Sequence, residues 1–230
     1  MQQHMRDLKT NEENRVPRGS LAILSNILRQ TGGFRRLIKS AFLDLRFGGK
    51  FLGGDIFNGD DQKGYFHTMN TDYRVMDFLF SKIKIQPDDT ITDVGCGKGR
   101  VFNYLLSKKL KNPMFGIELS ESVANFTSAR LKKYPQITVL RENVDTMKKI
   151  PGTIFYLYNP FGAETLRKFS ETVAREWKAS NNPKPIQIIY FNPKHPEIFR
   201  ENQVWEVSDV IDTNSLGYHC GAVLVRTRAK

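Results

Sequence analysis

The chain has 230 residues, 40% hydrophobic and 26% charged, which is the composition of an ordinary globular protein with one buried core. Its longest uninterrupted apolar run, Ile154 to Tyr158, has five residues, far short of the roughly 20 that a membrane-spanning helix needs. The two cysteines, Cys96 and Cys220, form no CxxC pair, and the N-terminus lacks the apolar stretch of a secretory signal. We therefore expect a cytoplasmic protein without a disulfide framework or a metal site.

The formal net charge of +11 is concentrated near the N-terminus, where residues 1–50 carry ten basic and four acidic side chains. Residues 1–20 are polar, lack periodicity and are predicted to form a poorly ordered tail. Residues 21–70 are predicted to form a basic helical extension and a glycine-rich loop. From Leu21 to Lys50, apolar and basic residues interleave as in amphipathic helices, with a break at Gly32-Gly33. The loop spans Arg46 to Gly54.

Two interpretations of this basic extension remain open. Residues 21–50 can bind an anionic partner, either nucleic acid or the inner face of a membrane, to which the protein would then be peripheral. Alternatively, the helices pack their apolar face on the rest of the chain as a cap and leave their charges in water. We favour the cap, because apolar residues are at least as numerous as charged ones in this segment.

Residues 71–230 show the pattern of a single α/β domain. Thr71 or Asp72 can cap a helix whose apolar residues recur at i, i+3, i+7 and i+10 from Tyr73. The runs rich in β-formers are Thr90–Val94, Met114–Leu119, Ile137–Leu140, Thr153–Tyr158 and Ile186–Phe191, and the helical stretches between them are Arg100–Leu110, Ser120–Tyr134 and Ala163–Ala179. Alternating strands and helices predict a doubly wound, mostly parallel sheet. Val204–Ile211 and Ala222–Thr227 predict a closing hairpin that brings the sheet to seven strands.

The most informative motif lies where the first predicted strand turns into its helix. Residues 93–100 read Asp-Val-Gly-Cys-Gly-Lys-Gly-Arg. Glycines at the carboxyl end of a strand let the backbone approach a ligand closely. Their GxGxG spacing differs from the GxGxxG of dinucleotide-binding folds, and the carboxylate of Asp93 favours a cationic ligand over a diphosphate.

A second acidic residue, Glu118, ends the next predicted strand, 23 positions beyond Gly95. A carboxylate at about this distance from a glycine loop hydrogen-bonds ribose hydroxyls in nucleoside-binding folds. Each feature has an ordinary structural explanation by itself. The glycine loop can be a simple turn, and Glu118 can be a negative charge that stabilises the start of a helix. Together, within one βαβ unit, they predict a nucleoside site.

With these residues the sequence resembles the class I S-adenosylmethionine-dependent methyltransferases, from about Tyr65 to the C-terminus. Asp93 to Gly99 matches the family's first motif, and Glu118 matches its ribose-binding acid. Residues 158–161, Tyr-Asn-Pro-Phe, stand where amino-methylating members carry Asn/Asp-Pro-Pro-aromatic, but one proline is missing. The chain looks more narrowly like a group of small bacterial methyltransferases of undetermined substrate, and more distantly like the non-SET histone-lysine methyltransferases.

The resemblance implies a Rossmann-like methyltransferase fold with a reversed strand in the C-terminal hairpin, S-adenosyl-L-methionine as cofactor, and a set of binding residues. Asn143 stands at the position where family members carry an Asp or Asn whose side chain contacts the adenine amino group. The segment around Thr68 corresponds to one that folds over the cofactor in many members. The cofactor contacts expected on this basis are Thr68, Asp93, Gly95, Cys96, Gly97, Gly99, Arg100, Glu118, Leu119, Asn143, Val144, Asn159 and Phe161.

Methyl transfer from a sulfonium needs alignment and desolvation more than it needs acid, base or metal. Asn159 is the candidate catalytic residue, because it can accept a hydrogen bond from an amine or orient a hydroxyl. Tyr65, Pro160, Asn192 and His195 are the candidates on the side of the methyl acceptor. Each has an ordinary alternative: Asn159 can simply close a strand, and the aromatic residues can simply be buried.

Three function classes are compatible with these features. The first is a methyltransferase (EC 2.1.1) whose acceptor is a small molecule or glycan, slightly ahead of a protein lysine or a nucleic acid. The second is a non-catalytic module on a degenerate methyltransferase fold that binds nucleic acid or a membrane surface. The third is a nicotinamide-dependent oxidoreductase. The intact set of Asp93, Gly95, Gly97, Gly99 and Glu118 favours the first, because a scaffold has no need of it.

Overall fold

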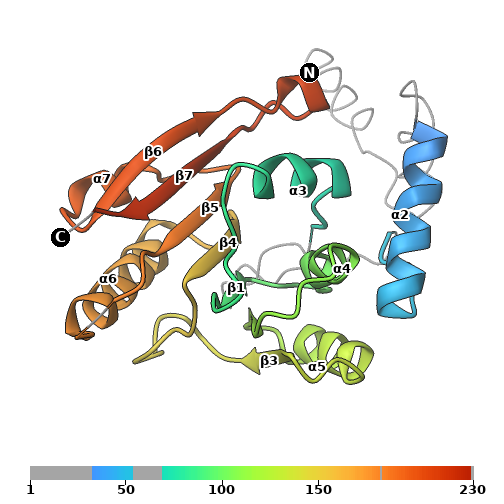
Figure 1. Cartoon of the computed structure of the whole chain (residues 1–230), viewed down its shortest axis with the longest axis horizontal. Helices are drawn as coiled ribbons and strands as arrows, with labels where there is room; N and C mark the ends of the chain where they lie inside the picture. The colour runs from blue at the N-terminus through green and yellow to red at the C-terminus, as the bar shows by residue number, and fades with distance from the viewer. Residues whose placement is uncertain (1–32, 54–68, 182, 229–230) are drawn as a thin grey trace, which may run out of the picture.

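The computed structural model describes residues 33–53, 69–181 and 183–228 of the chain. Its centre is a seven-stranded sheet in the order β3-β2-β1-β4-β5-β7-β6 (Figure 1). The strands are β1 (Ile91–Val94), β2 (Met114–Glu118), β3 (Ile137–Arg141), β4 (Ile154–Tyr158), β5 (Gln187–Phe191), β6 (Trp205–Ile211) and β7 (Ala222–Thr227). β1 to β5 pair in parallel, whereas β7 runs antiparallel to both β5 and β6. The doubly wound sheet with a reversed strand in a C-terminal hairpin is thus confirmed.

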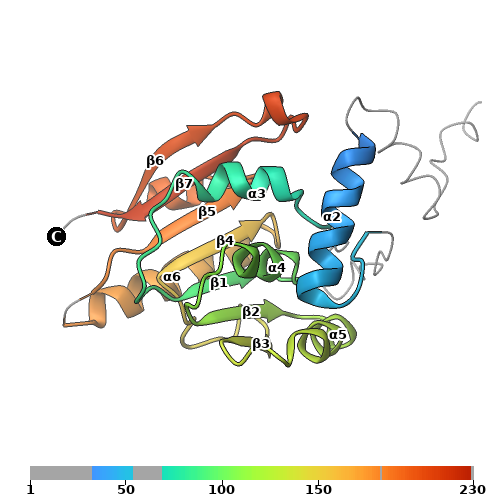
Figure 2. The same cartoon turned by 45° about the vertical axis from the view of Figure 1, so that its right-hand side comes forward.

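Helices cover both faces of the sheet (Figures 1 and 2). The helices are α2 (Gly33–Gly48), α3 (Tyr73–Phe80), α4 (Arg100–Ser107), α5 (Glu121–Leu131), α6 (Ala163–Ala179) and α7 (Glu197–Glu201), and a short 3₁₀ turn, η2 (Asn214–Leu216), lies between β6 and β7. α3, α4 and the end of α5 pack on one face, α6 and α7 on the other, so two apolar clusters flank the sheet. The central strands are therefore buried on both sides, as parallel strands usually are.

Local sequence explains most of the element boundaries. The side chain of Asp72 accepts a hydrogen bond from the Arg74 N–H at 2.8 Å and so caps α3, one of the two caps predicted. α4 ends at Ser107, earlier than the predicted Leu110, because Lys109 adopts a left-handed conformation and the Leu110 N–H turns back to the Leu105 carbonyl. α6 spans the predicted residues 163–179.

The N-terminal extension departs from the prediction in two respects. α2 continues to Gly48, so the first three residues of the predicted loop are helical. The helix also packs beside α4, but with only part of its apolar surface. Four of its large apolar residues are each more than half exposed: Phe34, Ile38, Phe42 and Leu45. Leu43 packs against the core, and a buried polar contact centred on Asp44 faces the domain beside it. The apolar contact predicted for the cap is therefore accompanied by a polar contact, and a large part of the apolar surface of α2 faces outward.

Candidate functional site

The glycine loop that follows β1 has left-handed residues at three alternate positions. Gly95, Gly97 and Gly99 have φ values of 73°, 49° and 72°. L-amino acids with a Cβ rarely adopt this conformation, so the backbone favours glycine at each position. A Cβ on Gly95 would also lie 2.6 Å from the Cβ of Pro160, which shows how closely the loop approaches the end of β4.

Hydrogen bonds from two other elements hold the loop in place. The Gly97 carbonyl accepts a bond from the Thr127 hydroxyl at 2.7 Å, and the Lys98 carbonyl accepts one from the Arg130 guanidinium at 2.6 Å. The Gly95 N–H donates to the Ile117 carbonyl at 2.8 Å. A loop fixed in this way does not have to be ordered by its ligand, which lowers the entropic cost of binding.

Glu118 lies against the same loop at the end of β2. Its carboxylate accepts one hydrogen bond from the Gly97 N–H and one from the Ser120 N–H, each at 2.9 Å. Burial raises the pKa of Glu118, while these N–H donors act in the opposite direction. The structure therefore brings together the glycine loop and the acidic partner that the sequence singled out.

Asp93 adds a second buried carboxyl group next to this pair. Its residue is 3% exposed, and the structure shows no hydrogen bond to its side chain within the described part of the chain. Burial, and then the charge of Glu118, raise the pKa of Asp93 well above its ordinary value. Both carboxyl groups are therefore costly to ionise in the free protein. A bound cation would stabilise their ionised form.

Two asparagines follow the neighbouring strands β4 and β5. Tyr158 pairs with Phe191 in register, so Asn159 and Asn192 lie beside each other at the carboxyl edge of the sheet. They have φ values of 40° and 52°, the left-handed region that asparagine tolerates better than most residues. Backbone strain of this kind clusters at functional sites, and here it occurs next to the glycine loop.

Other predicted residues have contacts that fit structural roles. The Asn143 side chain accepts a hydrogen bond from the Asp145 N–H at 2.9 Å and so closes a turn. The Phe161 ring packs near Phe169 of α6. His195 Nδ1 lies 3.4 Å from Glu197 at the start of α7, on the edge of the site.

The remaining predicted residues either lie close to the loop or lie outside the described residues. Cys96 and Val144 are buried, and Leu119 is half-buried beside Glu118. Tyr65 and Thr68 fall outside the residues that the structure describes.

Arg100 has a different partner from the predicted one. Its guanidinium donates to the carboxylate of Asp44 on α2, with Nη2–Oδ2 at 2.7 Å and Nε–Oδ1 at 3.2 Å. Asp44 is fully buried and also accepts hydrogen bonds from the Tyr73 hydroxyl at 2.6 Å and the Leu52 N–H at 3.1 Å. The Arg100 side chain therefore anchors α2, and a cofactor contact at this position stays a prediction.

A second bond ties the segment after α2 to the glycine loop. Lys98, the residue between Gly97 and Gly99, is 2% exposed, and its ammonium donates to the Leu52 carbonyl at 2.6 Å. Neither Asp44 nor Lys98 was predicted to have a role. One signal was available, because Asp44 is the only acidic residue between 21 and 50 in an otherwise basic segment.

Comparison with solved structures identifies the fold. The Escherichia coli protein yhhF, which is named as a methyltransferase, superposes with a TM-score of 0.53 at 17% identity, covering 71% of this chain and 90% of that one. A domain called StiE O-MT (residues 961–1257) gives 0.51 at 11% identity over 68% and 74%. The chain has the class I methyltransferase fold. At these identities the likeness shows the fold alone.

Sequence comparison adds one relative. A protein of Archaeoglobus fulgidus named as probable cobalt-precorrin-6B C(15)-methyltransferase (decarboxylating) is 26% identical over 97 residues. The match covers 42% of this chain and 57% of that protein. No protein family model matches the chain.

Proposed function

We propose that the chain is an S-adenosylmethionine-dependent methyltransferase (EC 2.1.1). The observation that carries the proposal is the glycine loop hydrogen-bonded to Glu118 beside the buried Asp93, at the carboxyl edge of a methyltransferase fold. Ligands of open α/β sheets bind at this edge. The positively charged sulfonium and ammonium groups of S-adenosylmethionine would stabilise the ionised carboxylates of Asp93 and Glu118. The negative charge of a diphosphate would not.

The residues of the candidate site divide into a group for the cofactor and a group for the methyl acceptor. The left-handed conformations of Gly95, Gly97 and Gly99 set the path of the loop at the carboxyl end of β1. We propose that Glu118, which lies against this loop, binds the ribose hydroxyls. When bound, the cofactor supplies an electrophilic methyl group for an in-line displacement. The protein's part is to hold the acceptor in line and exclude water, for which Asn159, Pro160 and Asn192 are placed at the ends of β4 and β5.

The acceptor that we favour is a small molecule or a glycan, ahead of a protein lysine or a nucleic acid. Asn159 is the proposed catalytic residue, because its amide can orient an amine or a hydroxyl. His195 stands at the start of α7, where it can act as base toward a hydroxyl acceptor. The incomplete Asn-Pro-Phe motif gives no preference for an amine.

The turnover test uses S-adenosylmethionine with a tritiated methyl group and cell extract as the source of acceptors. We expect the wild-type protein to transfer label and Gly97→Val to transfer none, because a branched side chain at φ 49° is strained and enters the ligand space. Gly162→Ala is the matched control: a Cβ there meets nothing within 4 Å, so transfer should match that of the wild type. Equal transfer by Gly97→Val and the wild type would overturn the assignment of the loop.

The raised pKa values of Asp93 and Glu118 predict a pH-dependent affinity. A cationic ligand favours the ionised carboxylates, so its binding releases protons wherever these groups are protonated in the free protein. Affinity for S-adenosylmethionine should rise as pH increases above the ordinary Asp value of 3.8, by at most about tenfold per pH unit for each proton released.

The matched ligand for this test is S-adenosylhomocysteine, which lacks the sulfonium charge. Its affinity should change less over the same pH range. Titrations of both ligands in buffers of different ionisation enthalpy measure the released protons directly. Identical pH profiles for the two ligands would show that neither carboxyl group responds to the sulfonium.

A membrane surface is the partner that we propose for α2. Among the described residues, no helix is long and apolar enough to cross a bilayer. The exposed stripe of Phe34, Ile38, Phe42 and Leu45 recurs at i, i+4, i+8 and i+11, and Arg35, Lys39 and Arg46 flank it on the same helix. An apolar stripe bordered by cations complements the interface of an anionic bilayer.

Vesicle sedimentation tests this partner. We expect the wild-type protein to bind phosphatidylcholine vesicles that contain phosphatidylglycerol, and Phe42→Asp to lose most of that binding. Phe42 is 59% exposed, so the substitution should leave the melting temperature unchanged. Binding that survives Phe42→Asp would assign the stripe to another occupant, such as a second copy of the chain.

A further inference from the structure

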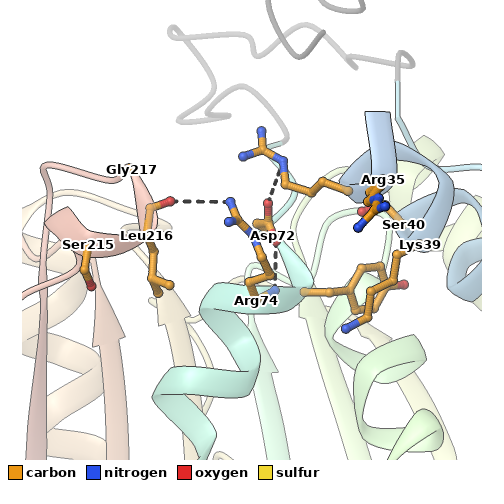
Figure 3. Close-up of a pocket in the computed structure, with 10 residues that line it drawn as sticks. Arg35, Lys39, Ser40, Asp72, Arg74, Ser215, Leu216 and Gly217 are labelled. Atoms are coloured by element: carbon orange, nitrogen blue, oxygen red, sulfur yellow. Dashed lines mark hydrogen bonds and ion pairs between the residues drawn. The ribbon is translucent and has the colours of Figure 1, made fainter. Parts of the chain in front are cut away.

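A cavity of about 470 Å³ opens between α2, the start of α3 and the turn between β6 and β7 (Figure 3). We call it the basic pocket. Figure 3 shows Arg35 and Lys39 on α2 opposite Ser215, Leu216 and Gly217, with Asp72 and Arg74 between them. Its volume lies in the range of small-molecule sites.

Cations outnumber carboxylates in the lining of the basic pocket. Arg35, Arg36, Lys39 and Arg74 line it together with Asp72, which gives a net formal charge of +3. Arg36 Nε lies 3.2 Å and Arg74 Nε 3.6 Å from the carboxylate of Asp72, which orients both guanidinium groups. Arg35 and Lys39 are exposed and form no ion pair within the described ranges, so their charges are available to an anion.

A chain of side-chain contacts connects the basic pocket with the ends of β4 and β5. The Tyr218 hydroxyl is 3.5 Å from Asp72 Oδ2, and the Tyr218 ring centroid is 6.1 Å from that of Phe191. Phe191 ends β5, immediately before Asn192. Its ring lies 4.6 Å from that of Tyr158, immediately before Asn159. One line of contacts therefore leads from the pocket to the strand ends where the acceptor is proposed to sit.

We propose that the basic pocket binds a phosphate group carried by the methyl acceptor. The proposal rests on the methyltransferase function argued above and narrows its substrate class. Guanidinium groups pair with phosphate in a bidentate manner, and three cations in excess suit a phosphate with up to two negative charges. Nucleic acid is less well matched, because it needs a track of cations along its backbone, and these four surround one cavity. The phosphate can belong to a free small molecule or to a lipid headgroup.

The first arm of the test uses inorganic phosphate as the probe, followed by ³¹P NMR at low ionic strength. We expect binding in the millimolar range by the wild-type protein and at least about tenfold weaker binding by Arg35→Gln/Lys39→Gln, because half of the cations are gone. Both residues are exposed and neither holds Asp72, so the fold should be unaffected. Arg175→Gln/Lys178→Gln on α6 is the matched control, with the same loss of charge outside the pocket.

The second arm separates the two sources of phosphate. The same variants are added to phosphatidylcholine vesicles with and without phosphatidylglycerol. Loss of binding to inorganic phosphate by the pocket variant without loss on anionic vesicles supports a free phosphorylated acceptor, and loss in both assays supports a lipid headgroup. Loss confined to anionic vesicles is the result expected from the exposed stripe of α2 alone and would overturn the pocket proposal. Equal behaviour of the pocket variant and the control variant in both arms would overturn the proposal. So would a short single-stranded oligonucleotide that binds the wild type more tightly than phosphate does and loses that binding in the pocket variant alone, because the pocket would then serve nucleic acid.

Titration of the same samples with S-adenosylhomocysteine keeps this result separate from the proposed function. We expect the pocket variant to bind it as the wild type does. If S-adenosylhomocysteine binds normally but the pocket variant binds phosphate as the control variant does, the proposal of a phosphorylated acceptor is wrong and the proposed methyltransferase function stands. If the wild-type protein does not bind S-adenosylhomocysteine, the proposed methyltransferase function itself is contradicted.

Discussion

Asp44→Ala is expected to lower the free energy of unfolding by about 3 to 5 kcal/mol, because it leaves a buried charge without its partner. The Arg100 side chain is 11% exposed, and Asp44 is its ion-pair partner at 2.7 Å. The Tyr73 hydroxyl and the Leu52 N–H lose an acceptor at the same time. Chemical denaturation of the full chain measures the change.

The matched control is Asp77→Ala on α3. Asp77 forms a surface ion pair with Lys108 in which its side chain is 54% exposed, so its loss should cost at most about 1 kcal/mol. Asp44→Asn keeps the shape and removes the charge, and should fall between the two. A loss for Asp44→Ala no larger than that for Asp77→Ala would show that α2 is not anchored through this carboxylate.

Substitution of Asp44 should also weaken cofactor binding at the glycine loop, which the carboxylate does not contact directly. Arg100 follows the glycine loop directly, and Lys98 within it is bonded to Leu52. Releasing α2 therefore removes supports on both sides of Gly99. Below the denaturation midpoint, we expect Asp44→Asn to bind S-adenosylhomocysteine less tightly while the native far-ultraviolet circular dichroism is kept.

Glu118→Ala is expected to weaken binding of S-adenosylhomocysteine by about 2 to 3 kcal/mol, or roughly 30-fold to 150-fold. The carboxylate is proposed to bind the ribose hydroxyls, and it also accepts hydrogen bonds from the N–H groups of Gly97 and Ser120. The substitution therefore removes ligand contacts and loosens the loop together. Glu118→Asp should do less harm, because it keeps a charge of the same sign.

Glu121→Ala is the control for this measurement. Glu121 lies three residues further along, and its ion pair with Arg141 is 58% exposed on both sides. Its loss should leave the affinity within about 0.5 kcal/mol of the wild type. Wild-type affinity in Glu118→Ala would move the ribose contact to another residue.

The sheet and the centre of the site could be predicted because both depend on short-range patterns. Strand runs such as Ile154–Tyr158 are continuous and apolar because both faces are buried, and the turn signals between residues 212 and 221 set the final hairpin. Gly95 and Glu118 occupy equivalent ends of adjacent parallel strands, so their proximity follows from the topology. Spacing along the chain was sufficient for these features.

The packing of α2 could not be predicted because it depends on one long-range polar contact. The helical pattern of residues 33–48 indicates an apolar face, and apolar faces usually turn inward. Here the partners of Asp44 come from residues 52, 73, 100 and 103, which the sequence does not bring together. The structure buries the Asp44–Arg100 pair and leaves four apolar side chains of α2 more than half exposed, and nothing in the local pattern of residues 33–48 indicates this choice.

The most direct test of the account is a calorimetric titration of the wild-type protein with S-adenosylhomocysteine and NAD⁺ side by side. We expect S-adenosylhomocysteine to bind without added metal, Gly97→Val to abolish the binding, and Gly162→Ala to retain it. NAD⁺ should give no heat of binding, because its diphosphate would face Asp93 and Glu118. Binding of NAD⁺ in preference to S-adenosylhomocysteine, or binding of neither, would contradict the assignment of this site to methyl transfer.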